Sequence, residues 1–177
     1  MGFLPSVNFQ NNTVYTNQYM INFLTGATPT GYTWDNNKYY GTGVFSYNGS
    51  STFMNGWQGW TGWDTHSTSS SSAPTGVWSF VQPNQYDSGR ANIVIYNWSL
   101  APTVSVDVSS AIPVGTRYQI QDAQNYFGPP VASGTYTGSP IVIPMTGLTI
   151  ATPNGTVPTT PTHTAPQFGA FVLTTLQ

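Results

Sequence analysis

The second half of the chain carries the clearest alternation of apolar and polar positions. Val104, Val106 and Val108 alternate with Ser105 and Asp107, which is the pattern of a strand with one buried face. Short apolar segments of this kind recur at intervals of roughly 10–20 residues between turn residues, a spacing that favours an antiparallel β-sandwich. The segments that we predict as strands are 77–81, 91–98, 103–108, 117–121, 141–145 and 168–173.

Two of these predicted strands carry a further signal. Residues 93–96 form a continuous apolar run, which predicts a strand that is covered on both faces. Pro144 lies within 141–145 and has no backbone N–H to donate, so we expect this strand at a sheet edge or at a bulge.

The first part of the chain contains an internal repeat with a period of 25 residues. Phe9 begins a segment made of an aromatic residue, a polar residue, two asparagines and a β-favouring run, and Trp34 begins a second such segment. A β-favouring repeat of this length suggests the stacked coils of a parallel β-helix. Asparagine suits the corners of such coils, because it tolerates a left-handed backbone and can hydrogen-bond along the stack. In an Asn-rich chain, two copies can also arise by coincidence.

Two segments of biased composition divide the chain. Residues 67–76 are mostly serine and threonine, which is typical of a flexible linker. Residues 149–166 are rich in threonine and proline and lie between two apolar runs, so we predict a long loop there. We therefore predict an all-β chain: a short parallel β-helix-like part with its cap over 1–66, a Ser-rich linker over 67–76, and an antiparallel β-sandwich over 77–177.

The composition excludes several classes of partner. Only 5% of the residues are charged, against a usual value of about 25%, and three residues are Lys or Arg. Three cations cannot neutralise a row of phosphates, which excludes nucleic acids and anionic membrane surfaces. No apolar run approaches the roughly 20 residues that span a bilayer, so we expect no membrane insertion. The chain has no cysteine, which excludes disulfides and thiolate metal sites.

The polar composition also suggests a location. Sparse charge combined with abundant Ser, Thr, Asn and Tyr indicates an extracellular protein. The first five residues lack the charged and apolar regions of a signal peptide, so we expect either a removed leader or a longer parent chain.

The segment 57–67 reads Trp-Gln-Gly-Trp-Thr-Gly-Trp-Asp-Thr-His-Ser and follows Asn37-Lys38-Tyr39-Tyr40 and Phe53. It resembles the closing coils of secreted right-handed parallel β-helix proteins of the pectate-lyase-like kind, in which a Trp-Gln-x-x-Thr-Gly-x-Asp-x-x-Ser run is common. The residues that match this run are Trp57, Gln58, Thr61, Gly62, Asp64 and Ser67.

Four later segments, 80–86, 89–98, 122–128 and 168–173, are similar to the small β-sandwich that follows such β-helices. The family's β-helices have many coils, and their catalytic grooves lie on coils that this chain lacks. The resemblance therefore implies an appendage, a fragment or a derived protein rather than the body of an enzyme.

Trp57, Trp60 and Trp63 form the densest local group of aromatic residues. Indole rings stack against the C–H faces of sugars, and the neighbouring Gln58 and Asp64 can exchange hydrogen bonds with sugar hydroxyls. We therefore predict these five residues as a ligand-binding site for a glycan. The alternative is that the tryptophans fill and cap the end of the β-helix, which is the role that the resemblance gives to Trp57.

Other candidate sites are weaker. Asp64 and His66 form a possible acid–base or metal pair, but a metal ion needs about four converging ligands and a catalytic base needs a third group to orient it. We therefore predict no catalytic residue, no metal and no cofactor, with Asp64 accepting N–H bonds in a turn and His66 exposed. Residues 97–98 and 124–127 form a second polar and aromatic set. The resemblance assigns them to the core and turns of the sandwich, and sugar contact is the alternative.

Three hypotheses for function follow. The first is a non-catalytic extracellular carbohydrate-binding or cell-surface module whose partner is a neutral polysaccharide. The second is a self-assembling extracellular filament or coat subunit whose partners are copies of itself, joined through exposed β edges and the N-terminal segment. The third is a polysaccharide lyase or hydrolase, which needs a carboxylate pair or a cation and a base around the sugar. With no glutamate and five aspartates, no motif points to such a set. We favour the first hypothesis and expect no enzyme.

Overall fold

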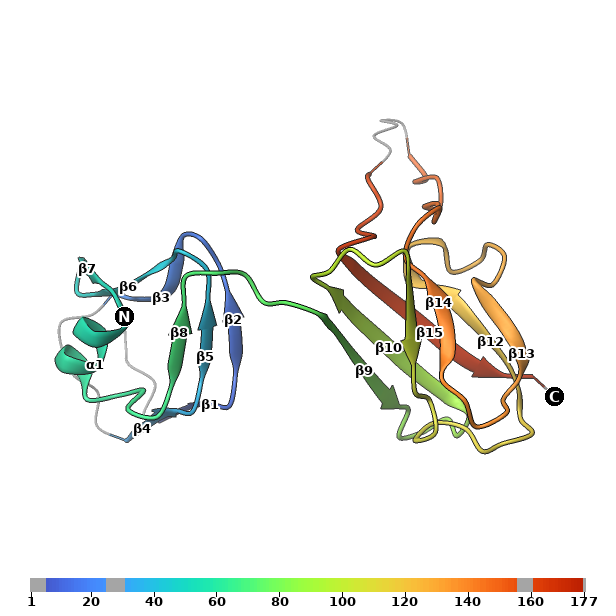
Figure 1. The fold of residues 1–177 in the computed structure, drawn as a ribbon, viewed down its shortest axis with the longest axis horizontal. Coiled ribbons are helices and arrows are strands. Elements are labelled where there is room, and N and C mark those ends of the chain that lie inside the picture. Colours follow the sequence, from blue (N-terminus) through green and yellow to red (C-terminus); the bar gives the residue numbers. More distant parts are fainter. Residues whose placement is uncertain (1–5, 25–30, 156–160, 177) are drawn as a thin grey trace. The chain divides into compact units, whose positions relative to one another are not determined.

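The computed structural model describes residues 6–24, 31–155 and 161–176 of the chain. They belong to two compact units, unit 1 over Met1–Pro74 and unit 2 over Thr75–Gln177. The described residues are mostly β, with small parallel sheets in unit 1 and a five-stranded antiparallel sheet in unit 2 (Figure 1).

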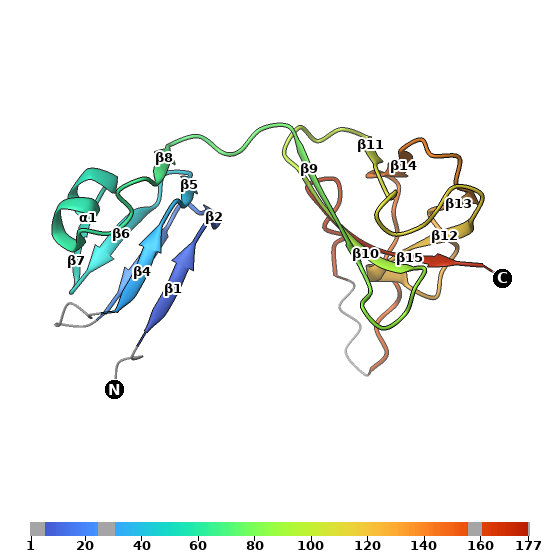
Figure 2. The same ribbon diagram turned by 90° about the horizontal axis from the view of Figure 1, so that it is seen from below.

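Unit 1 passes through the same three strand positions in successive coils (Figures 1 and 2). The first coil contains β1 (Val7–Gln10), β2 (Thr13–Tyr15) and β3 (Tyr19–Phe23). The second contains β4 (Tyr32–Asp35), β5 (Lys38–Tyr40) and β6 (Val44–Tyr47). The pairs β1–β4, β2–β5 and β3–β6 are all parallel. Phe9 lies beside Trp34, and Val14 lies beside Tyr39, so the 25-residue repeat predicted from the sequence is confirmed as the register of the coils.

The asparagine corners also form as predicted. Asn11 and Asn36 occupy equivalent positions after β1 and β4, and each has a φ of 57°. This left-handed conformation is costly for most residues because Cβ approaches the following carbonyl oxygen, whereas asparagine visits it readily. The repeated Asn-Asn pair therefore sets the corner at which each coil turns from one sheet into the next.

The second coil is followed by elements that close this end of unit 1. Strand β7 (Ser50–Thr52) returns antiparallel to β6, and helix α1 (Met54–Thr61) follows it. The helix ends at Gly62, which has a φ of 71° and donates its N–H to the Gln58 carbonyl oxygen. The helix inserts Met54 and Trp57 into an aromatic core, whose buried members are Met20, Tyr39, Phe45, Met54 and Trp57.

The Ser-rich segment is not a linker over its whole length. Residues Thr68–Ser70 form strand β8, which pairs in parallel with β5 and begins a third coil. A segment of serine and threonine can form a short edge strand as well as a linker, because the hydrogen bonds between strands are made by the backbone alone. The expectation of a flexible segment beginning at residue 67 was therefore wrong for this stretch, and the boundary between the units falls after Pro74.

Unit 2 contains a five-stranded antiparallel sheet in the order β13-β12-β15-β10-β9, and a separate antiparallel pair, β11–β14. All six strands predicted from the sequence are present, with ends that differ by a few residues. Their bounds are β9 (Val77–Pro83), β10 (Arg90–Asn97), β11 (Thr103–Val106), β12 (Arg117–Asp122), β14 (Ile141–Pro144) and β15 (Phe168–Thr175). Two elements were not predicted, β13 (Ala132–Thr135) and the short 3₁₀ helix η1 (Ala123–Asn125), because neither has an apolar pattern.

The core of unit 2 lies between the two sheets. Ile93, Ile95 and Leu173 of the five-stranded sheet are buried together with Val106 and Ile143 of the strand pair. Alternation along β10 therefore leaves Val94 half-buried and Tyr96 exposed on the opposite face of the sheet. The prediction that both faces of residues 93–96 are covered was wrong. Every second residue of this apolar run points to the outer face of the sheet, where aromatic side chains gather and Tyr96 is exposed.

The Thr/Pro-rich segment is a loop in its described parts, as predicted. The buried Asp122 accepts a 2.7 Å hydrogen bond from His163, and the Gln124 side chain oxygen accepts a 2.7 Å bond from the Thr164 hydroxyl. The Ala165 N–H donates to the other ring nitrogen of His163, so the nitrogen that faces Asp122 carries the proton. These contacts fix the end of the loop beside β12.

The left-handed corner gives a test of the coil geometry. We expect Asn36→Ala to destabilise unit 1 by about 1 kcal/mol, because the positive φ at this position is strained for alanine, whereas asparagine and glycine tolerate it. The matched variant Asn36→Gly should cost less. Hydrogen exchange measured by mass spectrometry on peptides of unit 1 separates the two. Equal protection in both variants would show that the corner is not under this constraint.

Candidate functional site

The three tryptophans predicted as a glycan platform lie in different environments. Trp57 and Trp60 lie on α1, and Trp63 follows the helix. Trp57 is buried and stacks on Phe45 with ring centroids 5.4 Å apart. Trp60 is 46% exposed. The spacing of three residues therefore does not place the indoles on one common surface.

Trp63 belongs to an aromatic stack inside unit 1. Its ring lies 5.6 Å from that of Trp34 at an interplanar angle of 11°, and 5.7 Å from that of Tyr32 at 25°. Phe23 contacts the same indole edge to face at 5.6 Å. Trp63 is half-buried, so the stack takes most of the surface that a sugar would need.

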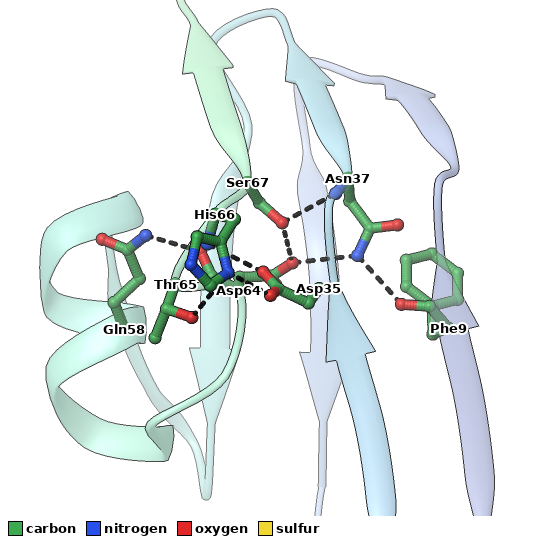
Figure 3. A network of polar contacts seen from close by, with 8 residues as sticks. All are labelled: Phe9, Asp35, Asn37, Gln58, Asp64, Thr65, His66 and Ser67. Carbon is green, nitrogen blue, oxygen red and sulfur yellow. Dashed lines mark hydrogen bonds and ion pairs between the residues drawn. The ribbon is translucent and has the colours of Figure 1, made fainter.

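Asp64 is the centre of a buried polar network (Figure 3). One carboxylate oxygen accepts hydrogen bonds from the Tyr39 hydroxyl at 2.9 Å and from the Trp57 indole N–H at 2.8 Å. The other accepts from the Asn37 side chain amide at 2.9 Å and from the Ser67 hydroxyl. Four donors thus occupy the roughly four acceptor positions that a carboxylate offers. This carboxylate has no acceptor position left for a sugar hydroxyl.

Asparagine side chains extend this network from coil to coil. The Asn37 side chain oxygen accepts from the backbone N–H of Asn12 at 2.9 Å and from its side chain amide at 3.2 Å. The Asn37 amide also donates to the Phe9 carbonyl oxygen at 3.0 Å (Figure 3). Asn12 and Asn37, one in each coil, therefore form a hydrogen-bonded ladder that ends at Asp64. The sequence predicted hydrogen bonds between stacked asparagines, but not that an aspartate ends the ladder.

The remaining predicted residue, Gln58, also has a structural partner. Its side chain amide donates a 2.6 Å hydrogen bond to the Asp64 carbonyl oxygen. Burial raises the pKa of Tyr39, and the charge of Asp64 adds to this shift, so the phenol keeps the proton that it donates. In this structure the family-like run from Trp57 to Ser67 is a cap whose polar groups satisfy one another.

A second carboxylate in this region holds a histidine at the surface. Asp35 lies 2.6 Å from Nδ1 of His66 and also accepts the His66 backbone N–H at 2.8 Å (Figure 3). These hydrogen bonds hold the pKa of the Asp35 carboxyl below its usual range. The imidazole is 74% exposed, as predicted for His66. Within the described ranges, no three His, Asp, Glu or Cys side chains gather as a metal ion requires.

A larger aromatic group lies on the outer face of the five-stranded sheet in unit 2. We call it the aromatic face, and its members are Trp78, Phe80, Tyr96, Trp98 and Phe168. Tyr96 lies at its centre, because it pairs with Trp78 on β9 and with Phe168 on β15. The Tyr96 ring lies 5.2 Å from that of Phe168, 6.4 Å from that of Phe80, and 6.2 Å from that of Trp98 in a stacked arrangement.

The aromatic face is accessible and has uncharged neighbours. Phe80 is 50% exposed and Tyr96 is 39% exposed, while the other three rings are half-buried. Asn92 and Gln82, which pair across β10 and β9, are exposed on the same face of the sheet. The charged residue of β10 is Arg90, six positions from Tyr96 and therefore roughly 20 Å along the strand. The aromatic end of this sheet face thus offers flat rings without a charge, and the amides of Asn92 and Gln82 lie between these rings and Arg90.

The sequence contained a signal for this face. Trp78 and Phe80 are two residues apart, as are Tyr96 and Trp98, and a spacing of two places side chains on the same face of a strand. The signal was missed because the resemblance assigned Trp98 to the core. Of that predicted set, Asn97 is buried and its amide donates to the carbonyl oxygens of Ala101 and Pro166, both at 2.8 Å.

Comparisons with protein families, with curated proteins and with solved structures found no match to this chain. No helix in the part of the chain that the structure describes is long and apolar enough to span a membrane.

The Asp64 network gives a test of the cap. We expect Asp64→Asn to destabilise unit 1 by about 3 kcal/mol. The NH2 group of the new asparagine would face hydrogen-bond donors that now bond to a carboxylate oxygen, and these buried donors would lose their acceptor. Hydrogen exchange of unit 1 peptides should rise, while that of unit 2 stays constant. Asp87→Asn, at an exposed carboxylate of unit 2, is the control. Unchanged protection in Asp64→Asn would show that the buried carboxylate contributes nothing to the cap.

The Asp35–His66 pair predicts a dependence on pH. A carboxyl whose pKa is lowered in the folded state adds stability above its unfolded pKa of about 4, and this is lost as the pH falls through the lower folded value. We therefore expect Asp35→Asn to lower the melting temperature at neutral pH, and the difference from wild type to shrink below about pH 4. In a His66→Ala background the same substitution should show a smaller pH dependence, because the imidazole contact is lost while the backbone N–H of residue 66 still bonds to Asp35. A pH-independent difference in both backgrounds would contradict the assignment.

Proposed function

We propose that the chain is a non-catalytic extracellular module that binds a neutral polysaccharide through the aromatic face of unit 2. We further infer that unit 1 is the closing part of a parallel β-helix, as the resemblance implies, and that unit 2 is the β-sandwich that follows it. The observation that carries the binding function is the cluster of five aromatic rings on an outer sheet face. None of these rings is needed to separate the two sheets of the core.

The chemistry of the aromatic face suits a sugar. The C–H faces of pyranose rings are apolar and flat, so they stack on indole and phenyl rings, while hydroxyls exchange hydrogen bonds with amides. Tyr96 presents a ring and a hydroxyl together, and Asn92 and Gln82 supply amides further along the same two strands. Binding of this kind depends little on charge, so we expect it to be insensitive to salt.

The shape of the aromatic face favours an extended ligand. Phe168, Tyr96 and Trp78 lie side by side on three neighbouring strands and span about 10 Å across the sheet. Phe80 and Trp98 continue the group along the strands on either side. A sheet face is an open platform rather than an enclosed pocket, which suits a polymer or its flat surface better than a single sugar.

The geometry supports binding rather than catalysis. The aromatic face includes no Asp or His, and hydrolysis of a glycosidic bond commonly uses two carboxyl groups that flank the bond. Asp64 is saturated by four donors, and Asp122 is held by His163 and by the backbone N–H of Gln124. The carboxylates at these positions organise the fold.

The binding site can be tested by alanine substitution of its central ring. We expect the wild-type chain to be retained by at least one neutral polysaccharide in a panel of cellulose, xylan, mannan and chitin. Tyr96→Ala should lower the affinity at least tenfold, because it removes the ring that contacts three others. Affinity electrophoresis and depletion onto the insoluble polymers measure this loss.

Two variants serve as controls in the same assay. Phe127 is 98% exposed on unit 2 but lies outside the aromatic face, so Phe127→Ala should bind as wild type does. Trp60→Ala tests the surface of unit 1 that the sequence predicted. Loss of binding in Trp60→Ala with retention in Tyr96→Ala would move the site to unit 1. Retention of the wild type by no member of the panel would overturn the proposed function.

A further inference from the structure

Beyond the aromatic face, the outer side of the five-stranded sheet changes from rings to amides. Asn92 of β10 pairs with Gln82 of β9 on one side. On its other side, Val172 of β15 lies between Asn92 and Gln121 of β12. Three amide side chains therefore lie in one row across four neighbouring strands. The side chain oxygen of Gln121 is buried and accepts no hydrogen bond from the described residues.

The next row introduces positive charge. Thr174 of β15 pairs with Arg90 of β10 on one side and with Gln119 of β12 on the other. Arg117 lies two residues before Gln119 and faces the same way, because the intervening Tyr118 points into the core. Both arginines of the chain therefore lie on the outer side of this sheet, at the end away from the aromatic face.

The two guanidinium groups lie within reach of one ligand. Arg90 and Arg117 are two strand spacings apart, which is about 10 Å across the sheet, and one register step of about 7 Å apart along the strands. Arginine carries its charge on a long aliphatic stem, so both groups can extend over the surface around Thr174. We call this surface, formed by Arg90, Thr174 and Arg117, the arginine subsite.

The polar groups of the arginine subsite have no partners among the described residues. The ion pairs in that part of the chain each join an aspartate to a histidine, so neither guanidinium is neutralised. Asp87, in the turn before β10, accepts the Arg90 backbone N–H with its carbonyl oxygen and not with its carboxylate. The Thr174 hydroxyl is buried and makes no hydrogen bond to the described residues. Two like charges on one face repel each other, and an unpaired buried hydroxyl is destabilising, so a bound anion would satisfy all three groups.

The distribution of charge selects an anion. Of the 177 residues three are Lys or Arg, and two of these three lie in the arginine subsite. The described strands of this sheet place no aspartate on their outer side, because Asp122 alternates with the outward Gln121 and is buried. The chain as a whole has a formal net charge of -2, so the positive charge is local. A guanidinium donates two parallel N–H bonds to a carboxylate, so the ligand that fits beside a polysaccharide site is an acidic sugar.

We propose that the arginine subsite binds the carboxylate of an acidic sugar, in a polysaccharide whose other sugars lie on the aromatic face. The roughly 20 Å between Tyr96 and Arg90 along β10 contains the amides of Asn92 and Gln82, which can exchange hydrogen bonds with the hydroxyls of intervening sugars. The inference rests on the proposed function, because stacking on the aromatic face is what holds the polymer along these strands. The preferred ligand is therefore a polysaccharide that combines neutral and carboxylate-bearing sugars in one chain.

Matched pairs of polymers test this preference on the full chain, by affinity electrophoresis and by depletion. Cellulose, mannan and chitin are each compared with the same polymer oxidised to the carboxylate at its primary hydroxyls, and glucuronoxylan is compared with its carboxyl-reduced form. For the polymer whose neutral form retains the chain, we expect the acidic form to bind at least tenfold more tightly at low salt. This gain should disappear at about 1 M salt, where the Debye length is about 3 Å. Equal affinity within every pair would overturn the proposal.

Variants that each remove one positive charge locate the effect. Arg90→Gln and Arg117→Gln keep a polar side chain on the sheet surface, and each should remove most of the gain in affinity for the acidic form. Lys38→Gln is the matched control, because it removes the third cation of the chain from an exposed position on unit 1. It should keep the full gain. An equal loss in Lys38→Gln and in the arginine variants would show an effect of net charge and would also overturn the proposal.

The arginine subsite and the aromatic face can fail separately in this assay. Tyr96→Ala should weaken the binding of the neutral and the acidic forms alike, because the central ring contacts three others. A wild type that binds both members of each pair equally, and loses both in Tyr96→Ala, would remove the arginine subsite and leave the aromatic face in place. A wild type that is retained by acidic forms only, and is unaffected by Tyr96→Ala, would support the arginine subsite and overturn the proposed function.

Discussion

A single buried negative charge, the Asp64 carboxylate, organises the end of unit 1. A carboxylate removed from water costs several kcal/mol unless donors replace its hydration. Its four side chain donors come from three separate places: Asn37 and Tyr39 in the second coil, Trp57 on helix α1, and Ser67 before strand β8. The helix and the start of the third coil can therefore take their positions only together with the second coil. The cap is a cooperative unit because its parts donate hydrogen bonds to the same carboxylate.

The ladder of polar side chains that joins the coils ends at this carboxylate. Asn37 lies between an aspartate on one side and an asparagine on the other, and both contacts use the same amide group. The ionised aspartate accepts four hydrogen bonds and has no N–H or O–H to donate to a further coil, so it ends the ladder. Because Lys38 pairs with Thr68, the position equivalent to Asn37 before β8 is Ser67, so the carboxylate that ends the ladder comes from outside the repeat.

Local signals in the sequence predicted the coil repeat and six strands of unit 2, but they missed strands β8 and β13 and did not reveal the network around Asp64. The 25-residue repeat and its asparagine corners depend on neighbouring residues, so the sequence revealed them. The role of Asp64 depends on Asn37 and Tyr39, which are 27 and 25 positions away, and no spacing rule connects them. The three tryptophans near Asp64 illustrate the same limit. A run of aromatic residues shows that rings are close in sequence, but the direction of each ring is set by the surroundings into which the chain folds.

The two units use their aromatic residues in opposite ways, and this difference supports a binding role for unit 2. The narrow coils of unit 1 are filled by stacked rings, so Trp57 and Trp63 contribute to folding. The core of unit 2 is mostly aliphatic, with isoleucine and valine from both sheets packed against each other. Its folding does not require the rings of the aromatic face, since half of the Phe80 surface remains in water. A group of large apolar side chains on one exposed face is typical of a surface that binds a partner or a ligand. The aromatic face is therefore better explained by a ligand than by the stability of the sheet that carries it.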